Sequence, residues 1–84
     1  HKKRDLKKGE ETSSLILYND DYNTFDHVIK SLVEVCGHDF VQAEQCAMIV
    51  HYHGSYEIKR GSAEVLTSMS RSLNERGLTS RVIT

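Results

Sequence analysis

Proline and tryptophan are absent from this 84-residue chain. Without proline, no helix in it can be kinked or stopped by a missing backbone N–H. Its longest apolar runs, at residues 15–17 and 47–50, are far shorter than the roughly 20 residues that a membrane-spanning helix requires. The basic first residues are not followed by an apolar stretch, so we expect neither a signal peptide nor a membrane partner.

Neither sign of charge is in excess, because 11 Lys and Arg stand against 12 Asp and Glu, for a net charge of −1. This balance disfavours a protein that binds nucleic acid through charge. A hydrophobic share of 38% and a charged share of 27% are typical of a folded globular chain. A chain of this length buries only about 60–65% of its unfolded surface. We therefore expect one domain with one core and no deep catalytic cavity.

Cysteine is scarce. Cys36 and Cys46 are the two present, and both fall on apolar helical patterns. Such thiols without a secretory signal are typical of small core residues in a reducing compartment. We therefore expect no disulfide and a cytoplasmic location.

The chain divides into two parts. Residues 1–13 contain a single apolar side chain, Leu6, and are predicted to form a flexible tail. Residues 14–84 are predicted to form the folded domain. Within it, the short apolar run at 14–18 predicts a buried strand, and the polar residues 19–23 predict a loop.

Two helices follow, with apolar residues at spacings of three and four. Asn23 is predicted to cap the first helix and Gly37 to end it, whereas Asp39 is predicted to cap the second and Gly54 to end it. A third helix is predicted after the N-cap Ser62. Its core face comprises Leu66, Met69 and Leu73, with Val65 beside them.

Two further strands complete the pattern. Residues 56–60 alternate with a period of two, which places Tyr56, Ile58 and Arg60 on one side. Residues 81–83 form the last predicted strand. The order β-α-α-β-α-β predicts an α+β sandwich in which three helices pack on one face of a three-stranded sheet.

The loop after the first strand carries Asn19, Asp20 and Asp21. Their oxygens could bind a hard cation, accept hydrogen bonds from an ammonium group, or cap and solvate a turn. The residue pattern favours the turn, because the glycine and the final glutamate of an EF-hand loop are missing.

The second predicted helix ends on His51, Tyr52 and His53. Two histidines spaced by two residues do not share a helix face, and no third ligand has a suggestive spacing, so a zinc site is disfavoured. A histidine at a helix C-terminus commonly caps it. No nucleophile elbow, His-Glu-x-x-His sequence or glycine-rich phosphate loop is present, so we expect no enzyme, metal or cofactor.

Three blocks in this chain resemble the ClpS family of adaptor proteins. They are residues 17–29, with Asn-Asp-Asp before a helix; residues 47–54, with Val-His-x-x-Gly; and residues 63–65, with Ala-Glu. The resemblance implies a compact adaptor without catalytic activity or cofactor. Such an adaptor binds the free N-terminus of proteins that begin with Leu, Phe, Tyr or Trp. It delivers them to the N-domain of a Clp AAA+ unfoldase, such as ClpA or ClpC, which feeds the ClpP peptidase.

The resemblance also implies roles for individual residues. Asn19 and His51 would bind the α-amino group directly, and Asp20 would help through hydrogen bonds or water. Glu64 would contact the unfoldase. The hydrophobic side-chain pocket would be formed by Asp21, Asn23, Phe25, Val28, Ala47 and Val50.

This sequence departs from the family pattern at the pocket. Phe25 and Ala47 stand where methionine or another large residue is usual, which predicts a shifted preference among the four starting residues. Leu78 or Ser80 is expected to replace a Pro-Leu step that completes the pocket. The alternative function is a scaffold of the same fold that docks on an AAA+ protein but has lost recognition of N-termini. In either case we expect the protein to be a monomer.

Overall fold

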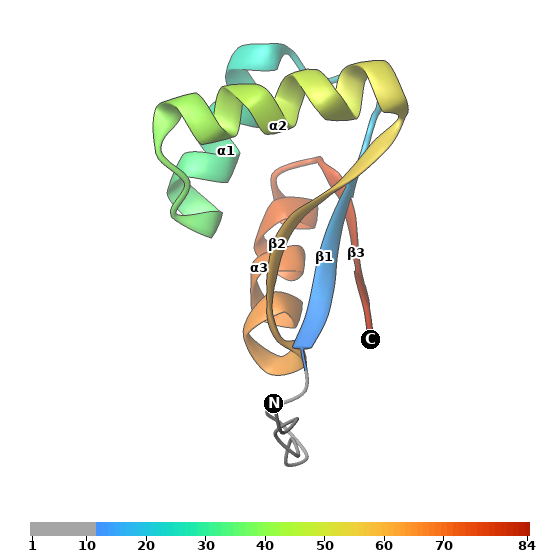
Figure 1. The fold of residues 1–84 in the computed structure, drawn as a ribbon. Helices are drawn as coiled ribbons and strands as arrows, with labels where there is room; N and C mark the ends of the chain where they lie inside the picture. Colours follow the sequence, from blue (N-terminus) through green and yellow to red (C-terminus); the bar gives the residue numbers. More distant parts are fainter. Residues whose placement is uncertain (1–11) are drawn as a thin grey trace, which may run out of the picture.

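The computed structural model describes residues 12–84, which fold in the predicted order of strands and helices (Figure 1). The elements are β1 (Thr12–Tyr18), α1 (Phe25–Cys36), α2 (Phe40–His53), β2 (Ser55–Ser62), α3 (Ala63–Glu75) and β3 (Thr79–Ile83). None of these helices is long and apolar enough to cross a membrane.

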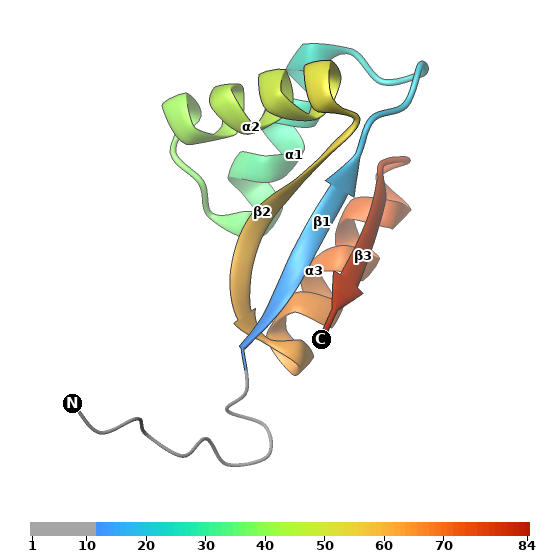
Figure 2. The same ribbon diagram turned by 45° about the vertical axis from the view of Figure 1, so that its right-hand side comes forward.

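The three strands form one antiparallel sheet in the order β2-β1-β3. In β1, Ser13, Leu15 and Leu17 are buried, while the residues between them are half-buried. One face of the sheet is therefore covered and the other is open. Figure 2 shows α3 behind β1 and β3, and α1 and α2 near the end of the sheet where β1 stops. The predicted architecture is confirmed.

The strands β1 and β3 both begin two residues earlier than predicted. β1 begins at Thr12, which pairs with Ser62, and Ser13 is only 2% exposed. These two residues belong to the sheet rather than to the predicted tail, whose other residues lie outside the described part of the chain. β3 begins at Thr79, which pairs with Tyr18. These polar residues lack the apolar pattern that predicts a strand, and they belong to the sheet because they pair with neighbouring strands.

The predicted strict alternation along β2 is wrong, because the strand contains a bulge. Leu15 pairs with Lys59 but Ile16 pairs with Glu57, so Ile58 is an extra residue that turns into the core. The bulge returns Glu57 and Arg60 to the same open face of the sheet. There they form an ion pair of 3.0 Å between Arg60 Nε and Glu57 Oε2.

The helix ends follow the sequence with one exception. Asp39 caps α2 in a capping box with Gln42, and Gly54 ends that helix with a positive φ of 90°. The cap of α1 is Thr24, whose Oγ1 accepts from the His27 N–H at 3.1 Å. The predicted cap, Asn23, is committed to other contacts described below.

The core lies between the sheet and the helices. It includes both cysteines, which are free and buried, as predicted for core residues. Burial raises the pKa of Cys36 to about 11, so its thiol stays protonated. Met69 packs against the core, and Val65, which was predicted to lie beside this face, is 51% exposed.

Candidate functional site

A cleft of about 290 Å³ opens where the end of β1, the start of α1 and the last turns of α2 meet. Its walls come from segments that are far apart in the sequence. They are formed by Leu17, Tyr18, Asn19, Asp20, Asp21, Asn23, Thr24, Phe25, Val28, Ala47, Val50, His51 and Leu78.

Asp20 organises the loop that forms one wall of the cleft. Its Oδ1 accepts from the backbone N–H groups of Tyr22 at 2.8 Å and Asn23 at 2.7 Å, and its Oδ2 accepts from Asn23 Nδ2 at 2.9 Å. Partial burial acts to raise the pKa of Asp20, but these hydrogen bonds and the nearby His27 outweigh it and lower the pKa. The carboxylate is therefore ionised at neutral pH and already spends most of its acceptor capacity on the loop.

The loop is tied to the turn between α3 and β3. Asn23 Nδ2 also donates to the carbonyl oxygen of Gly77 at 2.9 Å, and His27 Nε2 donates to that of Arg76 at 2.8 Å. The Arg76 guanidinium contacts Glu34 of α1 at 2.7 Å. Gly77 has a φ of 90°, which favours glycine at this position. These bonds hold the following residue, Leu78, in the wall of the cleft.

Asn19 and His51 provide free polar groups in the cleft. The backbone N–H of Asn19 donates to the carbonyl oxygen of Gly54 at 2.9 Å, which fixes the end of β1 beside the end of α2. Within residues 12–84, the side-chain amide of Asn19 and the ring nitrogens of His51 have no hydrogen-bond partner. Both are therefore open to a ligand.

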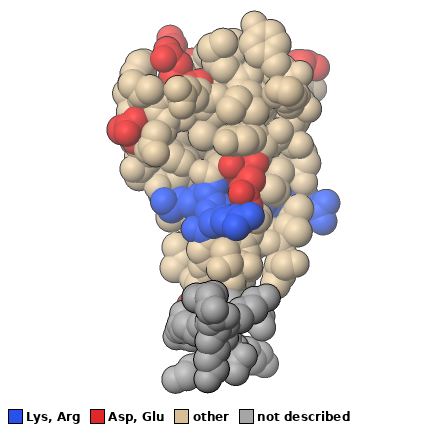
Figure 3. Space-filling view, in the orientation of Figure 1, with Lys and Arg blue, Asp and Glu red and all other residues tan. Residues whose placement is uncertain are grey.

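Charge in the cleft is of one sign. The lining includes Asp20 and Asp21 and no Lys or Arg. Figure 3 shows the Lys and Arg side chains gathered in a band across the sheet, whereas the part over α2 carries none on that face. Such a cleft favours a cationic ligand group over an anionic one.

The deeper part of the cleft is apolar. Leu17, Ala47, Val50 and Leu78 are each less than 5% exposed, and Val28 is half-buried. At the mouth, Phe25 is 44% exposed and its ring lies 5.1 Å from the ring of His51 between centroids. The cleft thus joins a polar rim to an apolar interior. Its volume is near the lower end of ligand pockets, so it suits a single side chain.

The structure brings all the predicted amine-binding and pocket residues into this one cleft. Three further residues line the cleft that were not predicted from the sequence, namely Leu17, Tyr18 and Thr24. Leu17 could have been predicted, because it is the last inward-facing residue of β1 before Asn19. Leu78 lines the cleft, whereas Ser80 is buried against Ser70 and Asn74 and does not.

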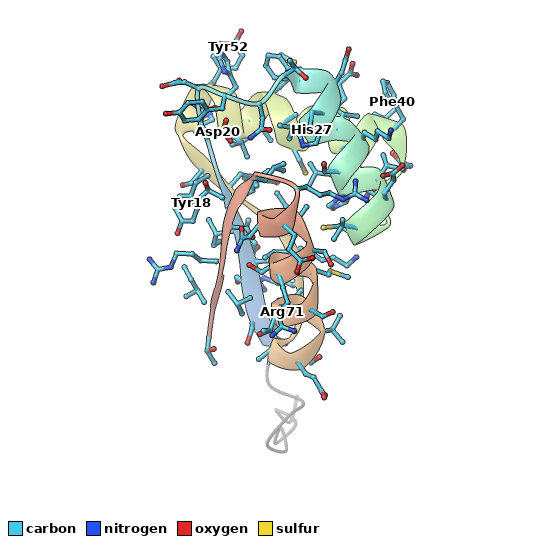
Figure 4. All side chains as sticks on the ribbon, turned by 180° about the vertical axis from the view of Figure 1, so that it is seen from behind. Tyr18, Asp20, His27, Phe40, Tyr52 and Arg71 are labelled. Carbon is cyan, nitrogen blue, oxygen red and sulfur yellow. The ribbon has the colours of Figure 1, made fainter. Side chains whose placement is uncertain are left out.

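Glu64 lies away from the cleft. It is exposed in the first turn of α3. That turn follows Ser62, which pairs with Thr12 at the start of β1, whereas the cleft lies where β1 ends. Figure 4 shows Asp20 and Tyr52 at the cleft end of the molecule and Phe40 at the other end of α2.

Among residues 12–84, no three His, Cys, Asp or Glu side chains are arranged to hold a metal ion.

Comparison with known proteins places this chain in a family. The sequence profile described as "ATP-dependent Clp protease adaptor protein ClpS" matches residues 8–81. Among curated proteins, none matches the chain. Among solved structures, ClpS2 of Agrobacterium tumefaciens bound to L-phenylalaninamide has the same fold, with a TM-score of 0.79 and 19% identity over 88% of this chain and 95% of that one. Because the profile spans most of its length, this chain belongs to the ClpS family of Clp protease adaptors.

Proposed function

We propose that this protein binds the free N-terminus of proteins that start with Leu, Phe, Tyr or Trp, and delivers them to a Clp AAA+ unfoldase for degradation. The observation that carries the proposal is the shared cleft of Asn19 and His51. Two unengaged acceptors stand at the rim of an apolar pocket that contains no Lys or Arg.

The rim suits an α-amino group. That group has an ordinary pKa of about 7.7–8.0 and is mostly an ammonium at neutral pH. It needs acceptors from different directions, which the amide oxygen of Asn19 and a neutral ring nitrogen of His51 would supply. Asp20 would act mainly by holding the loop and by its charge, because its oxygens already accept three hydrogen bonds.

The interior suits the first side chain of the substrate. L-phenylalaninamide, which is bound to Agrobacterium ClpS2, carries a free α-amine, a benzyl group and an amide in place of the next peptide bond. The same three features in a substrate would match the rim, the interior and the open mouth of this cleft. Leu17, Val28 and Val50 would contact the side chain, and Phe25 would cover it.

The expected energies require both contacts. A charge-assisted hydrogen bond contributes about 1.5–3 kcal/mol, and burial of a Leu or Phe side chain contributes a similar amount, about 1.5–3 kcal/mol. Together, hydrogen bonds to Asn19 and His51 and the buried side chain can exceed the cost of association. Either contact alone would not, so the cleft would select chains that present a free amine and a bulky apolar residue together.

Delivery would use a different surface. Glu64 is exposed and distant from the cleft, so an unfoldase N-domain could bind there while the substrate stays in place. We place this activity in the cytoplasm, where free thiols such as Cys36 and Cys46 stay reduced, and we propose that the adaptor acts as a monomer. Replacing Glu64 with lysine should weaken unfoldase binding and leave peptide affinity unchanged.

The test of recognition compares a fluorescent peptide that begins with Phe with its N-acetylated twin, by fluorescence anisotropy. Tight binding of the free peptide and at least tenfold weaker binding of the acetylated one are expected. The second candidate is the docking scaffold without N-terminal recognition, which the unusual Phe25 and Ala47 favour. Equal binding of both peptides, or binding of neither, together with retained unfoldase binding would establish the scaffold instead.

A further inference from the structure

The imidazole of His51 is held by aromatic side chains. The ring of Phe25 approaches it with 5.1 Å between centroids and 60° between planes, and Tyr52 meets it edge-on at 5.0 Å and 77°. No hydrogen bond within residues 12–84 reaches either ring nitrogen. Within residues 12–84, these ring contacts are therefore what restrains the imidazole.

Two other histidines show the more common arrangement. His27 Nε2 donates to the carbonyl oxygen of Arg76, and His38 Nε2 donates to that of Ile58, each at 2.8 Å. Such a bond fixes both the orientation and the tautomer of an imidazole. A histidine that recognises a ligand needs the same control, since small misplacements of a binding group weaken it. Within the described part of the chain, no carbonyl supplies that control to His51.

Phe25 is well placed to fix the orientation of the His51 ring. It is the first residue of α1, and the Thr24 cap fixes the start of that helix. The same ring also lines the cleft. We propose that Phe25 is a positioning residue that couples the two halves of the site: it closes the side-chain pocket and holds the His51 imidazole in the orientation that accepts the α-amine. This inference rests on the proposed function.

A coupling residue has a signature that a simple wall does not. Loss of a wall weakens every ligand with the same side chain by the same factor. Loss of the imidazole's support weakens only the ligand that uses the amine. The ratio of affinities for the free and the N-acetylated peptide therefore separates the two roles.

The chain offers a matched control for this test. Phe40 is also the first residue of its helix and is exposed, but it lies at the end of α2 opposite the cleft (Figure 4). Phe25→Leu should lower the ratio of affinities by about threefold to tenfold, the range of aromatic-pair energies. Phe25→Tyr, which keeps the ring, and Phe40→Leu should leave the ratio within about twofold of the wild type. If Phe25→Leu does not fold, Phe25→Met gives the same comparison without a ring.

A ligand-free measurement accompanies it. The ring-proton signals of His51 in NMR spectra should shift in Phe25→Leu, while those of His53 should not. Equal weakening of both peptides by Phe25→Leu, with an unchanged ratio, would overturn the coupling and leave the proposed function intact. If the wild type itself binds both peptides alike, the proposed function fails and the coupling fails with it.

Discussion

The side-chain amide of Asn23 donates to the carbonyl oxygen of Gly77 at 2.9 Å, and so joins the loop after β1 to the turn before β3. The same nitrogen donates to Asp20 Oδ2 at 2.9 Å. One amide group thus holds together two neighbouring segments of the cleft wall. This use of Asn23 explains why Thr24 rather than Asn23 caps α1.

Replacing Asn23 with alanine should therefore lower both stability and peptide affinity. Two hydrogen bonds at about 0.5–1.5 kcal/mol each predict a loss of roughly 1–3 kcal/mol in the free energy of unfolding, measured with urea. The matched control is Asn19→Ala. Since the Asn19 side chain has no partner within residues 12–84, it should lose peptide affinity and keep wild-type stability. An unstable Asn19→Ala would contradict this division of roles.

The carboxylate of Asp20 predicts a dependence of stability on pH. Burial acts to raise its pKa, but the hydrogen bonds from Asn23 and Tyr22 lower the pKa by more than burial raises it. The folded pKa therefore lies below the ordinary 3.8. A depressed folded pKa gives stability that is present above about pH 4 and is lost as the pH falls through the folded value. Asp20→Asn should thus melt at a lower temperature than the wild type at pH 7.

This difference in melting temperature should shrink as the pH falls from 3.8 through the lower folded pKa, below which Asp20 is neutral in both folded and unfolded chains. Asp26→Asn is the control, because Asp26 is exposed and its carboxylate has no hydrogen-bond partner within residues 12–84. Asp26→Asn loses only the interaction of that charge with the N-terminus of α1, about 0.3–1 kcal/mol, so at pH 7 it should melt closer to the wild type than Asp20→Asn does. A constant gap between Asp20→Asn and the wild type at every pH would argue against the hydrogen-bonded carboxylate.

The histidines at the end of α2 allow a test of the amine contact. His51 lines the cleft and His53 does not, and both are exposed. His51→Ala should weaken binding of a Phe-starting peptide by about tenfold or more, as expected for a charge-assisted hydrogen bond, while His53→Ala should not. Because a protonated imidazole has no acceptor nitrogen, wild-type binding should also weaken on acidification, and His51→Ala should lose that dependence. Equal effects of the two substitutions would exclude the assigned role.

Ala47 predicts the size preference of the pocket. It is 4% exposed and lines the cleft, so Ala47→Met would fill part of the interior. Affinity for Trp-, Tyr- and Phe-starting peptides should fall by about tenfold relative to Leu-starting peptides, the usual size of such steric discrimination. Isothermal titration with the four peptides measures this. A uniform loss for all four would mean that the methionine points elsewhere.

Much of the fold follows from local patterns. The apolar spacings of the helices and the Asp39 and Ser62 caps involve residues near one another in sequence, so they predict α2 and α3 well. No local pattern predicts the bulge at Ile58, because the bulge depends on the register in which β2 pairs with β1. The choice of cap for α1 was missed for a related reason: both Asn23 and Thr24 can cap a helix, and the distant Gly77 decides between them.

The cleft was predictable where chemistry and position coincide. Asn19 and His51 stand at the ends of a predicted strand and a predicted helix, and their residue types match the family motif. The orientation of the His51 ring was not predictable, since it depends on a contact with Phe25 across two helices. The sequence left both Leu78 and Ser80 as candidates for the residue that completes the pocket. It could not decide between them, because the turn that places Leu78 is held by tertiary hydrogen bonds.

The antiparallel pairing of β3 with β1 sets Ser14 opposite Ile83, so both ends of the described chain leave the sheet at the side remote from the cleft. The length of β1, on the order of 15–20 Å, separates these exits from the mouth. A fluorophore or surface linkage at Thr84 therefore leaves the mouth unobstructed. By the same geometry, a partner that binds near Thr12 would contact the domain at the end of β1 remote from the cleft.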